Sequence, residues 1–408
     1  MDKCKVNLFN EKKECCGCGA CKNICPKDAI TFIEDEYGFT YPQIDIERCI
    51  GCELCKKVCD FQKIDTKNSI VKTYAAISKH DRILEKSASG GIFGSLALEF
   101  LNKGGVVYGC SMELENNQLY PKHIRVSDVS NLNKILGSKY VQSDLNDCFN
   151  KIRKDLLNKR KVLFSGTPCQ VASLNLYLSS INIDKLYTVD IICHGVPNSK
   201  FFKDYISELE KRLKGTVTNF RFRDKSNGWG LLGAVDYLSN NGSKKTKLIN
   251  AETSSYFKLF LESSTYRESC YNCKYTNSSR PADLTLGDFW GIQTEHPNYL
   301  KENGGILDLK KGISCILVNN SKGINLIEKY GKEINLKESV FEKVSNGNDQ
   351  LKFPSKISHD RDKILNLYKN NGYSAVDKWF NKRIGLVKYK ITIKTLIKAK
   401  INRFLIKK

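Results

Sequence analysis

The chain has 408 residues, of which 41% are hydrophobic and 27% are charged. These proportions exclude a disordered or a fibrous protein, and the length suffices for two or three domains with at least one substantial core. Lys and Arg number 66 against 44 Asp and Glu, which gives a formal net charge of +22.

The sequence predicts a protein of a reducing compartment. The N-terminus opens with Met1-Asp2-Lys3-Cys4-Lys5, and no apolar run follows it, so we expect no secretory signal. No stretch approaches the roughly 18 apolar residues of a membrane span. Seventeen cysteines in such a chain favour metal or redox sites over disulfides. We therefore expect a cytoplasmic location, with peripheral contact at the inner face of the membrane as a variant of it.

The first 59 residues hold ten of these cysteines, arranged as two copies of one spacing. The copies are Cys15-x2-Cys18-x2-Cys21-x3-Cys25-Pro26 and Cys49-x2-Cys52-x2-Cys55-x3-Cys59. Bacterial two-cluster ferredoxins have this spacing, and the fourth cysteine of each copy binds the other copy's 4Fe-4S cluster. We predict cluster one on Cys15, Cys18, Cys21 and Cys59, and cluster two on Cys49, Cys52, Cys55 and Cys25.

Two zinc sites are the alternative interpretation, which the spacing disfavours because zinc takes four ligands and rarely uses three pairs at intervals of 3, 3 and 4 residues. Cys16 is interpreted as a non-ligand, since its use would break the spacing. Asp60 stands where a Pro is expected after the second copy. That Pro shapes the turn without binding iron, so only the local geometry is put in question.

The chain is predicted to continue as a larger body with alternating strands and helices. The polar stretch 63–69 indicates a linker after the cysteine-rich head. The predicted elements are, in chain order, a helix at 92–101, strands at 105–109, 161–165 and 187–192, a helix at 201–213, and strands at 219–223, 233–238, 283–286 and 313–318. Asn240-Asn241-Gly242 indicates a hairpin after 233–238.

One unit of the body has a predicted topology. Gly166-Thr167-Pro168 supplies a turn, an N-cap and a first-turn Pro for a helix between the strands at 161–165 and 187–192. Strands joined by such a crossover run parallel. We therefore expect a mixed sheet.

The predicted fold class is α+β or α/β, with a ferredoxin-like two-cluster head, a mixed-sheet α/β body of the flavin-binding type and a basic helical C-terminal tail. The predicted domains are a 4Fe-4S domain at 1–66, a linker at 67–73, the two parts of the body at 74–150 and 151–320, a helical extension at 321–382 and the tail at 383–408.

The tail, residues 383–408, contains nine Lys and Arg and no acid, with apolar residues at roughly helical spacing. It would lie on a membrane surface, contact a partner, or pack on the body as a solvated helix. Nucleic acid is not expected, because no binding motif accompanies the charge.

Four later cysteines form a candidate third site. Cys169 and Cys193 each follow one of the two parallel strands, and ligands bind at that edge of open α/β sheets. Cys270 and Cys273 form a separate Cys-x2-Cys pair. The four would hold a third 4Fe-4S cluster or zinc. The alternative is that Cys169 and Cys193 are core residues and the late pair binds nothing.

Two segments are candidates for cofactor binding. Ser87, Ser89, Gly90 and Gly91 precede a helix, where backbone N–H groups and hydroxyls favour a phosphate. The alternative is a Ser N-cap with turn glycines. Lys139 and Tyr140 lie in 137–143, and a Lys near a flavin would stabilise its reduced anion, unless the segment is a surface turn.

His194, between Cys193 and Gly195, is the best-placed His for proton transfer, although a His in a turn is more often a plain hydrogen-bonding residue.

The body resembles the coenzyme F-420 hydrogenase/dehydrogenase beta-subunit family over about residues 74–320. The motifs that carry the resemblance are Ser87-Ala88-Ser89-Gly90-Gly91, Gly137-Ser138-Lys139-Tyr140-Val141-Gln142, Phe164-Ser165-Gly166-Thr167-Pro168-Cys169-Gln170, Asp190-Ile191-Ile192-Cys193-His194-Gly195-Val196-Pro197, Cys270-x2-Cys273 and Gly287-Asp288-Phe289. The resemblance implies an iron-sulfur flavoprotein that passes electrons between clusters, FAD and a soluble deazaflavin. It also implies that the Ser-Gly loop binds the flavin phosphate and that the four later cysteines bind an inner cluster.

Two hypotheses follow. In the first, the chain is an oxidoreductase whose clusters relay electrons to a flavin that exchanges a hydride with an unknown soluble substrate or a deazaflavin-like carrier. In the second, it is an accessory electron-transfer subunit without flavin chemistry of its own, which docks on a redox partner protein. The chain lacks a hydrogenase metal motif and is not expected to be a hydrogenase by itself.

Overall fold

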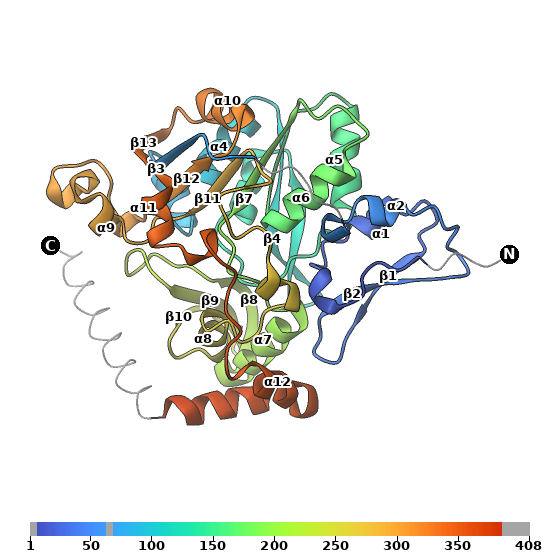
Figure 1. Ribbon diagram of the computed structural model, residues 1–408. Coiled ribbons are helices and arrows are strands. Elements are labelled where there is room, and N and C mark those ends of the chain that lie inside the picture. The colour runs from blue at the N-terminus through green and yellow to red at the C-terminus, as the bar shows by residue number, and fades with distance from the viewer. Residues whose placement is uncertain (1–5, 63–67, 386–408) are drawn as a thin grey trace.

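The computed structural model describes residues 6–62 and 68–385. Figure 1 shows a small head at the N-terminal end lying beside a larger body. The head contains α1 (Ala20–Ile24), β1 (Ile30–Glu34), β2 (Thr40–Ile44), α2 (Leu54–Lys57) and the 3₁₀ turn η2 (Asp60–Gln62). Its two strands pair antiparallel, with Ile30 opposite Ile44.

The head has a very small apolar core. Leu8, Ile30 and Cys55 are its buried members, and partly buried cysteine and apolar side chains complete it. So small a core supplies little stability by itself, and domains of this size commonly depend on a bound metal group.

A mixed eight-stranded sheet forms the centre of the body, in the order β13-β3-β12-β11-β7-β6-β4-β5. Its strands are β3 (Lys72–Ser78), β4 (Val106–Glu115), β5 (Gln118–Val126), β6 (Val162–Gly166), β7 (Leu186–Ile191), β11 (Leu284–Asp288), β12 (Ser314–Val318) and β13 (Ile334–Ser339). The neighbours β4, β6, β7 and β11 run parallel to one another, whereas the outer pairs are antiparallel. The predicted mixed sheet is therefore confirmed.

Helices cover both faces of this sheet (Figure 1). Val107 points to one face and packs with α4 (Ile92–Asn102) and α10 (Ser321–Tyr330). Val106 and Tyr108 point to the other face and pack with α5 (Cys148–Leu157) and α6 (Pro168–Tyr177). This alternation follows from the two-residue period of a strand. Smaller helices, α3 (Asp81–Lys86), α9 (Ile292–Glu295) and α11 (Phe341–Asn346), contribute to an apolar cluster with β3 and β12.

The unit β6–α6–β7 has the predicted crossover topology. β6 and β7 are parallel, with Val162 opposite Leu186. Thr167 is the N-cap of α6, and Gln170 completes a capping box with it. The helix therefore begins directly at the carboxyl end of β6, which places Cys169 in its first turn.

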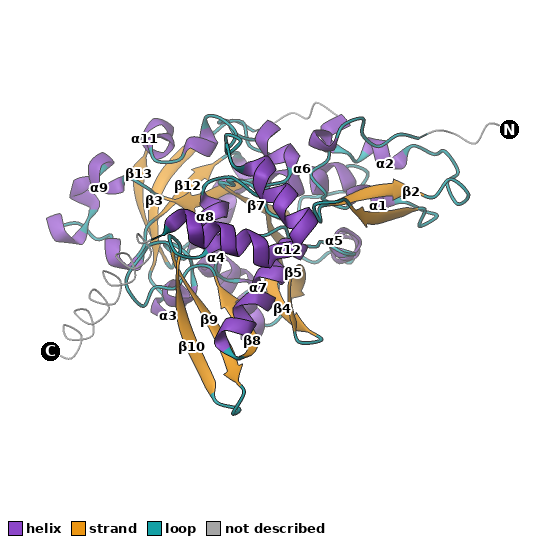
Figure 2. Cartoon of the chain, turned by 90° about the horizontal axis from the view of Figure 1, so that it is seen from below, coloured by secondary structure: helices purple, strands orange, loops and turns teal. Residues whose placement is uncertain are grey.

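A second, antiparallel sheet packs beside the first. It consists of β8 (Gly215–Arg221), β9 (Leu232–Ser239) and β10 (Lys244–Asn250), with the predicted hairpin between β9 and β10. Figure 2 shows this sheet extending away from the main one beside α7. Its core is largely aromatic and includes residues of α7 (Ser199–Leu213), α8 (Ser255–Leu261) and α12 (Arg361–Ile384).

The structure differs from the predicted boundaries in two places. β3 begins at Lys72, inside the segment predicted as linker, because residues 72–78 pair with both β12 and β13. The extension predicted as helical, 321–382, contains β13 between its helices, since residues 334–339 complete an edge of the main sheet. Of the predicted basic tail, only residues 383–385 belong to the described part, where α12 ends.

Within residues 6–62 and 68–385, no helix combines the length and apolar character that crossing a bilayer requires.

Candidate functional site

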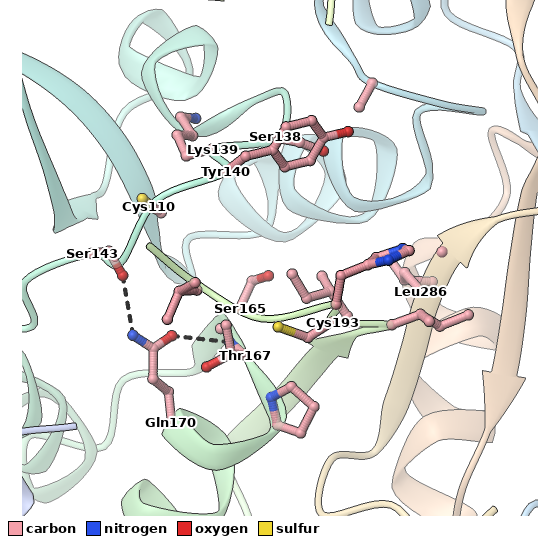
Figure 3. A pocket seen from close by; sticks show the side chains of 18 of the residues that line it. Cys110, Ser138, Lys139, Tyr140, Ser143, Ser165, Thr167, Gln170, Cys193 and Leu286 are labelled. Atoms are coloured by element: carbon pink, nitrogen blue, oxygen red, sulfur yellow. Dashed lines mark hydrogen bonds between the residues drawn. The ribbon is translucent and has the colours of Figure 1, made fainter. Parts of the chain in front are cut away.

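A cavity of about 310 Å³ lies at the carboxyl ends of the parallel strands β4, β6, β7 and β11. Its size lies at the lower end of the range of small-molecule sites. Figure 3 shows Cys193 and Thr167 on one side of it and Cys110, Lys139 and Tyr140 on the other. Several separate segments that the sequence singled out thus meet at one place.

The four later cysteines all line this cavity. Cys169 follows β6, Cys193 follows β7, and the other pair comes from the 3₁₀ segment η4 (Glu268–Asn272) and the residue after it. Burial raises the pKa of Cys193 well above that of a free thiol, and the three neighbouring cysteines Cys270, Cys169 and Cys273 add to this effect. Four thiols drawn from three segments into one buried place form a donor set suited to a metal cluster.

The eight predicted ligand cysteines of the head separate into an inner and an outer group. Burial, with Cys18, Cys15 and Cys59 close by, raises the pKa of Cys21, so the predicted cluster-one cysteines are neighbours. Burial also raises the pKa of Cys55, which has Cys52 and Cys49 beside it. Cys52 is exposed at the surface, so the predicted cluster-two site faces outward. Among the described residues, no three His, Cys, Asp or Glu side chains are already grouped as ligands of a single metal ion.

Cys16 lies between the head cysteines and the later set. Its thiol is a close neighbour of those of Cys18 and Cys169, and its interaction with them lowers the pKa of both, that of Cys18 to about 7. Cys16 also lines the cavity, together with Phe61 of the head. The sequence spacing predicted only that Cys16 is not a cluster-one ligand and gave no sign of this position.

The Ser-Gly loop is tied to the sheet. The Ser89 hydroxyl donates to the Ile313 carbonyl oxygen at 2.8 Å, and the Gly90 N–H donates to Ser314 Oγ at 2.9 Å. A Cβ at Gly90 would lie 2.4 Å from the carbonyl oxygen of Ala76. Close packing against β3 and β12 therefore explains this glycine. Gly91, with φ +77°, is the N-cap of α4, and it lines the cavity with Ser87.

Lys139 reaches the wall of the cavity, but its ammonium is already engaged. Nζ donates to the carbonyl oxygens of Leu136 at 2.8 Å, Gly137 at 3.2 Å and Lys134 at 3.4 Å. Burial lowers its pKa. Figure 3 shows the amine turned away from Cys193. The predicted contact between this lysine and a flavin would require these three hydrogen bonds to be exchanged.

Tyr140 and His194 are the other two predicted residues of this cavity. The Tyr140 ring stacks on Phe260 with 4.6 Å between centroids, and its hydroxyl accepts from Arg223 Nη1 at 3.2 Å. The His194 side chain is open to solvent along the cavity, while the surrounding walls lower its pKa by desolvation. His194 is therefore the exposed imidazole of this wall.

A buried hydrogen-bond chain in the wall was missed from the sequence. Gln170 Oε1 accepts from Thr167 N–H at 2.9 Å, and its Nε2 donates to Ser143 Oγ at 3.1 Å. Ser143 Oγ lies 3.1 Å from His123 Nδ1, and His123 Nε2 lies 3.0 Å from the Ser165 carbonyl oxygen. A carbonyl only accepts, so Nε2 carries the proton and the Ser143 hydroxyl donates to Nδ1.

His123 is therefore held neutral in one tautomer. Desolvation lowers its pKa to about 4. In the sequence, Gln170 appeared only as the last residue of the motif Phe164–Gln170, and His123 lies in a strand without any local motif.

A second missed feature is the joint between head and body. The fully buried Arg267 donates to the carbonyl oxygens of Cys15, at 3.3 Å, and of Thr40, and its Nε donates to Gln142 Oε1 at 3.1 Å. Its guanidinium also lies 4.4 Å from the centroid of the Tyr41 ring. Gln142 in turn donates to the carbonyl oxygens of Cys16 and Gly17, both at 3.3 Å. The loop 15–18, which contains the first two predicted ligands of cluster one, is thus fixed against the segment 137–143. This loop is called the cluster-one loop below.

Comparisons with known proteins match two parts of the chain. Residues 14–63 match the family model of the 4Fe-4S dicluster domain, and residues 159–343 match that of the C terminus of the beta subunit of coenzyme F-420 hydrogenase/dehydrogenase. No curated protein matches the chain. Among solved structures, a chain of the F-420-reducing NiFe hydrogenase complex from Methanosarcina barkeri, in its xenon derivative, is 17% identical with a TM-score of 0.43, over 79% of this chain and 94% of that one.

Proposed function

We propose that this chain is an iron-sulfur flavin oxidoreductase. It joins a 4Fe-4S dicluster domain to a region that matches the C-terminal part of the beta subunit in the coenzyme F-420 hydrogenase/dehydrogenase family. The clusters of the head would exchange electrons with a flavin in the body. The flavin would exchange a hydride with a soluble substrate or a deazaflavin-like carrier.

One observation carries the proposal. The same cavity is lined by Cys16 and Phe61 of the head, by the four later cysteines, and by the Ser-Gly loop with the segment 137–143. Electron transfer requires that successive redox groups lie close together. Here α1 and η2 of the head pack on α6, whose first turn contains Cys169, so the predicted cluster-one ligands and the inner set are neighbours.

The placement of the cysteines supports an order for the relay. Cys52 of the cluster-two set is exposed, whereas the cluster-one set faces the body. A redox partner protein or a small carrier would therefore meet cluster two first. Electrons would then pass through cluster one and an inner cluster on Cys169, Cys193, Cys270 and Cys273. The direction of flow depends on the substrate and can be the reverse.

The lining of the cavity fits a flavin in part. Its walls contain apolar side chains, among them Ile92, Phe93 and Leu286, which suit a planar aromatic ring. The start of α4, at Ile92, presents backbone N–H groups beside Ser87, a setting that favours a phosphate. A bound flavin supplies the conversion between single electrons and a hydride.

Specific residues of the chain would then have separate tasks. Ser87 and the backbone at Gly91 would hold the phosphate end, and Tyr140 would flank the ring. His194 is the group that would move a proton, because its imidazole is open to the cavity. We assign Lys139 no role in flavin binding, because its ammonium already donates hydrogen bonds to three carbonyl groups.

The function can be tested by stopped-flow spectroscopy on the anaerobic holoprotein. Dithionite-reduced methyl viologen serves as the one-electron donor, and bleaching of the flavin absorbance is followed. The proposal predicts rapid bleaching in the parent and a loss of the fast phase in Cys193→Ala. Equal fast phases in the two proteins would show that electrons bypass the inner cysteine set and would contradict the relay.

A second function is supported by a different observation. Ser89, Gly90 and Lys139 are committed to hydrogen bonds or packing within the protein, so part of the predicted flavin site has a structural explanation. In that case the chain is an accessory electron-transfer subunit, and the cavity is where a partner's redox group docks. Holoprotein that contains three clusters and no flavin would favour this second function.

A further inference from the structure

Asp60 and Lys274 form an ion pair across the joint between head and body. Asp60 Oδ2 lies 2.9 Å from Lys274 Nζ, and only 2% of the Asp60 surface is exposed. The Lys274 ammonium also donates to the Asp60 backbone carbonyl oxygen and lies 5.0 Å from the centroid of the Phe61 ring. These contacts fix the Lys274 ammonium in one position relative to Asp60.

The sequence positions of the two residues are informative. Asp60 directly follows Cys59, the last predicted ligand of cluster one, and Lys274 directly follows Cys273, the last cysteine of the inner set. Each charged residue is therefore the sequence neighbour of a cysteine that is predicted to bind a different cluster. The departure from the ferredoxin pattern at Asp60, where a Pro is expected, has a structural counterpart in this contact.

Asp60 lies where the head contacts the inner cysteine set. The turn η2, which begins at Asp60, packs on α6, whose first turn contains Cys169, and Phe61 lines the same cavity as Cys273. The Asp60 side chain is almost completely buried, so salt and water screen its charge poorly, whereas 31% of the Lys274 side chain is exposed.

We infer that the Asp60–Lys274 pair is a positioning and tuning element that sets the potentials of cluster one and the inner cluster relative to each other. The inference rests on the proposed function. Net charge near an iron-sulfur cluster shifts its reduction potential, because reduction adds a negative charge to the cluster. The two charges of the pair act on the clusters with opposite sign. Removal of one of them therefore makes the local potential more like that of the other.

The inference predicts shifts of opposite sign. Asp60→Asn removes a negative charge and should raise the midpoint potential of cluster one, whereas Lys274→Met removes a positive charge and should lower it. We expect about a tenfold change in the reduction equilibrium for each, which for one electron is about 59 mV. The double variant should return close to the parent. The measurement is an EPR-monitored redox titration of the anaerobic holoprotein.

A second head–body ion pair provides the matched control. Lys200 Nζ lies 2.9 Å from Glu34 Oε2, but both side chains are about half exposed. Glu34→Gln and Lys200→Met should leave all potentials unchanged, because exposed charges are screened. Shifts of equal size in these controls, shifts of the same sign in the two single variants, or no shift would overturn the inference.

The double variant also guards against a failure to assemble. It removes one negative and one positive charge, so the net charge of the joint is unchanged. It should therefore fold and load iron even where a single variant does not. Iron content separates this inference from the proposed function. Parent protein with about eight iron would remove the inner cluster and reject the proposed relay. Opposite shifts of cluster one in the same protein would still uphold the tuning role of the pair at that cluster.

Discussion

Arg267 of the body donates a hydrogen bond from Nη1 to the backbone carbonyl oxygen of Cys15, at 3.3 Å. The arginine is completely buried, so its charge is compensated by the acceptors and the Tyr41 ring around it and not by water. A cationic donor aimed at the cluster-one loop fixes the head in one orientation. It also places positive charge beside the predicted site of cluster one, which would become more negative on reduction.

Arg267→Met should destabilise the joint. The substitution leaves the carbonyl oxygens of Cys15 and Thr40 and the Gln142 amide without this donor, at a cost of about 1–3 kcal/mol for each unsatisfied buried group. We expect a lower melting temperature and easier loss of cluster one, measured by calorimetry and by the visible absorbance of the anaerobic protein. Arg212→Met is the control, because Arg212 is exposed and lies 3.5 Å from Asp377. An equal effect of both variants would contradict the role of Arg267.

Cys59→Ala should remove cluster one although Cys59 is far in sequence from the other three ligands. Cys59 lies close enough to Cys21 to affect its pKa, as the crossed ligand pattern requires. The expected result is a loss of about four iron and four sulfide per chain. Cys16→Ala is the matched control and should retain all iron, because Cys16 lies outside the predicted ligand sets. Unchanged iron in Cys59→Ala would defeat the assignment.

Cys193→Ala should remove the inner cluster alone. We expect about four iron fewer per chain, with the EPR signals of the two head clusters retained. Cys315→Ala tests whether any buried thiol of the sheet has this effect. Cys315 is fully buried, and its thiol donates to the Asp288 carbonyl oxygen at 3.6 Å, but it is not in the predicted set. The prediction fails if the two variants contain the same amount of iron.

The neutral His123 should make stability depend on pH. Its folded pKa of about 4 lies below the ordinary value of 6.5, so between these values the unfolded chain binds more protons than the folded one. The free energy of unfolding should therefore fall as the pH drops from about 6.5 to 4, by at most about 3 kcal/mol from this residue. Above about pH 6.5 the residue should contribute no pH dependence.

The measurement for His123 is anaerobic urea unfolding at several pH values across this window. His123→Gln should reduce the slope of the unfolding free energy against pH while lowering stability at neutral pH, because the amide replaces the imidazole only in part. An unchanged slope in the variant would mean that the dependence on pH comes from other groups.

The sequence predicted the features that arise from local chemistry. Gly166, Thr167 and Pro168 indicate a helix start, and the strands on either side are rich in apolar residues, so β6–α6–β7 could be placed in advance. The parallel topology then placed Cys169 and Cys193 at one edge of the sheet, where the structure has them both. Periodicity and capping are properties of neighbouring residues, so they can be read along the chain.

The features that were missed depend on contacts between distant segments. Arg267 meets the carbonyl group of Cys15 and Asp60 meets Lys274 only because the head docks on the body, and no local pattern signals this. The interpretation of Gly90 was incomplete for the same reason, since its close neighbours are Ala76 and Ser314 on other strands. Lys139 was predicted to lie near a flavin, but nearby carbonyl groups accept hydrogen bonds from its ammonium.

The most direct test of the central claim is the content of iron, acid-labile sulfide and released flavin in anaerobically purified protein. The account predicts about twelve iron, twelve sulfide and one flavin per chain, that is, three clusters and a flavin in the cavity. About eight iron and no flavin would contradict it. That result would restrict the redox groups to the head and leave the cavity to a ligand of another kind.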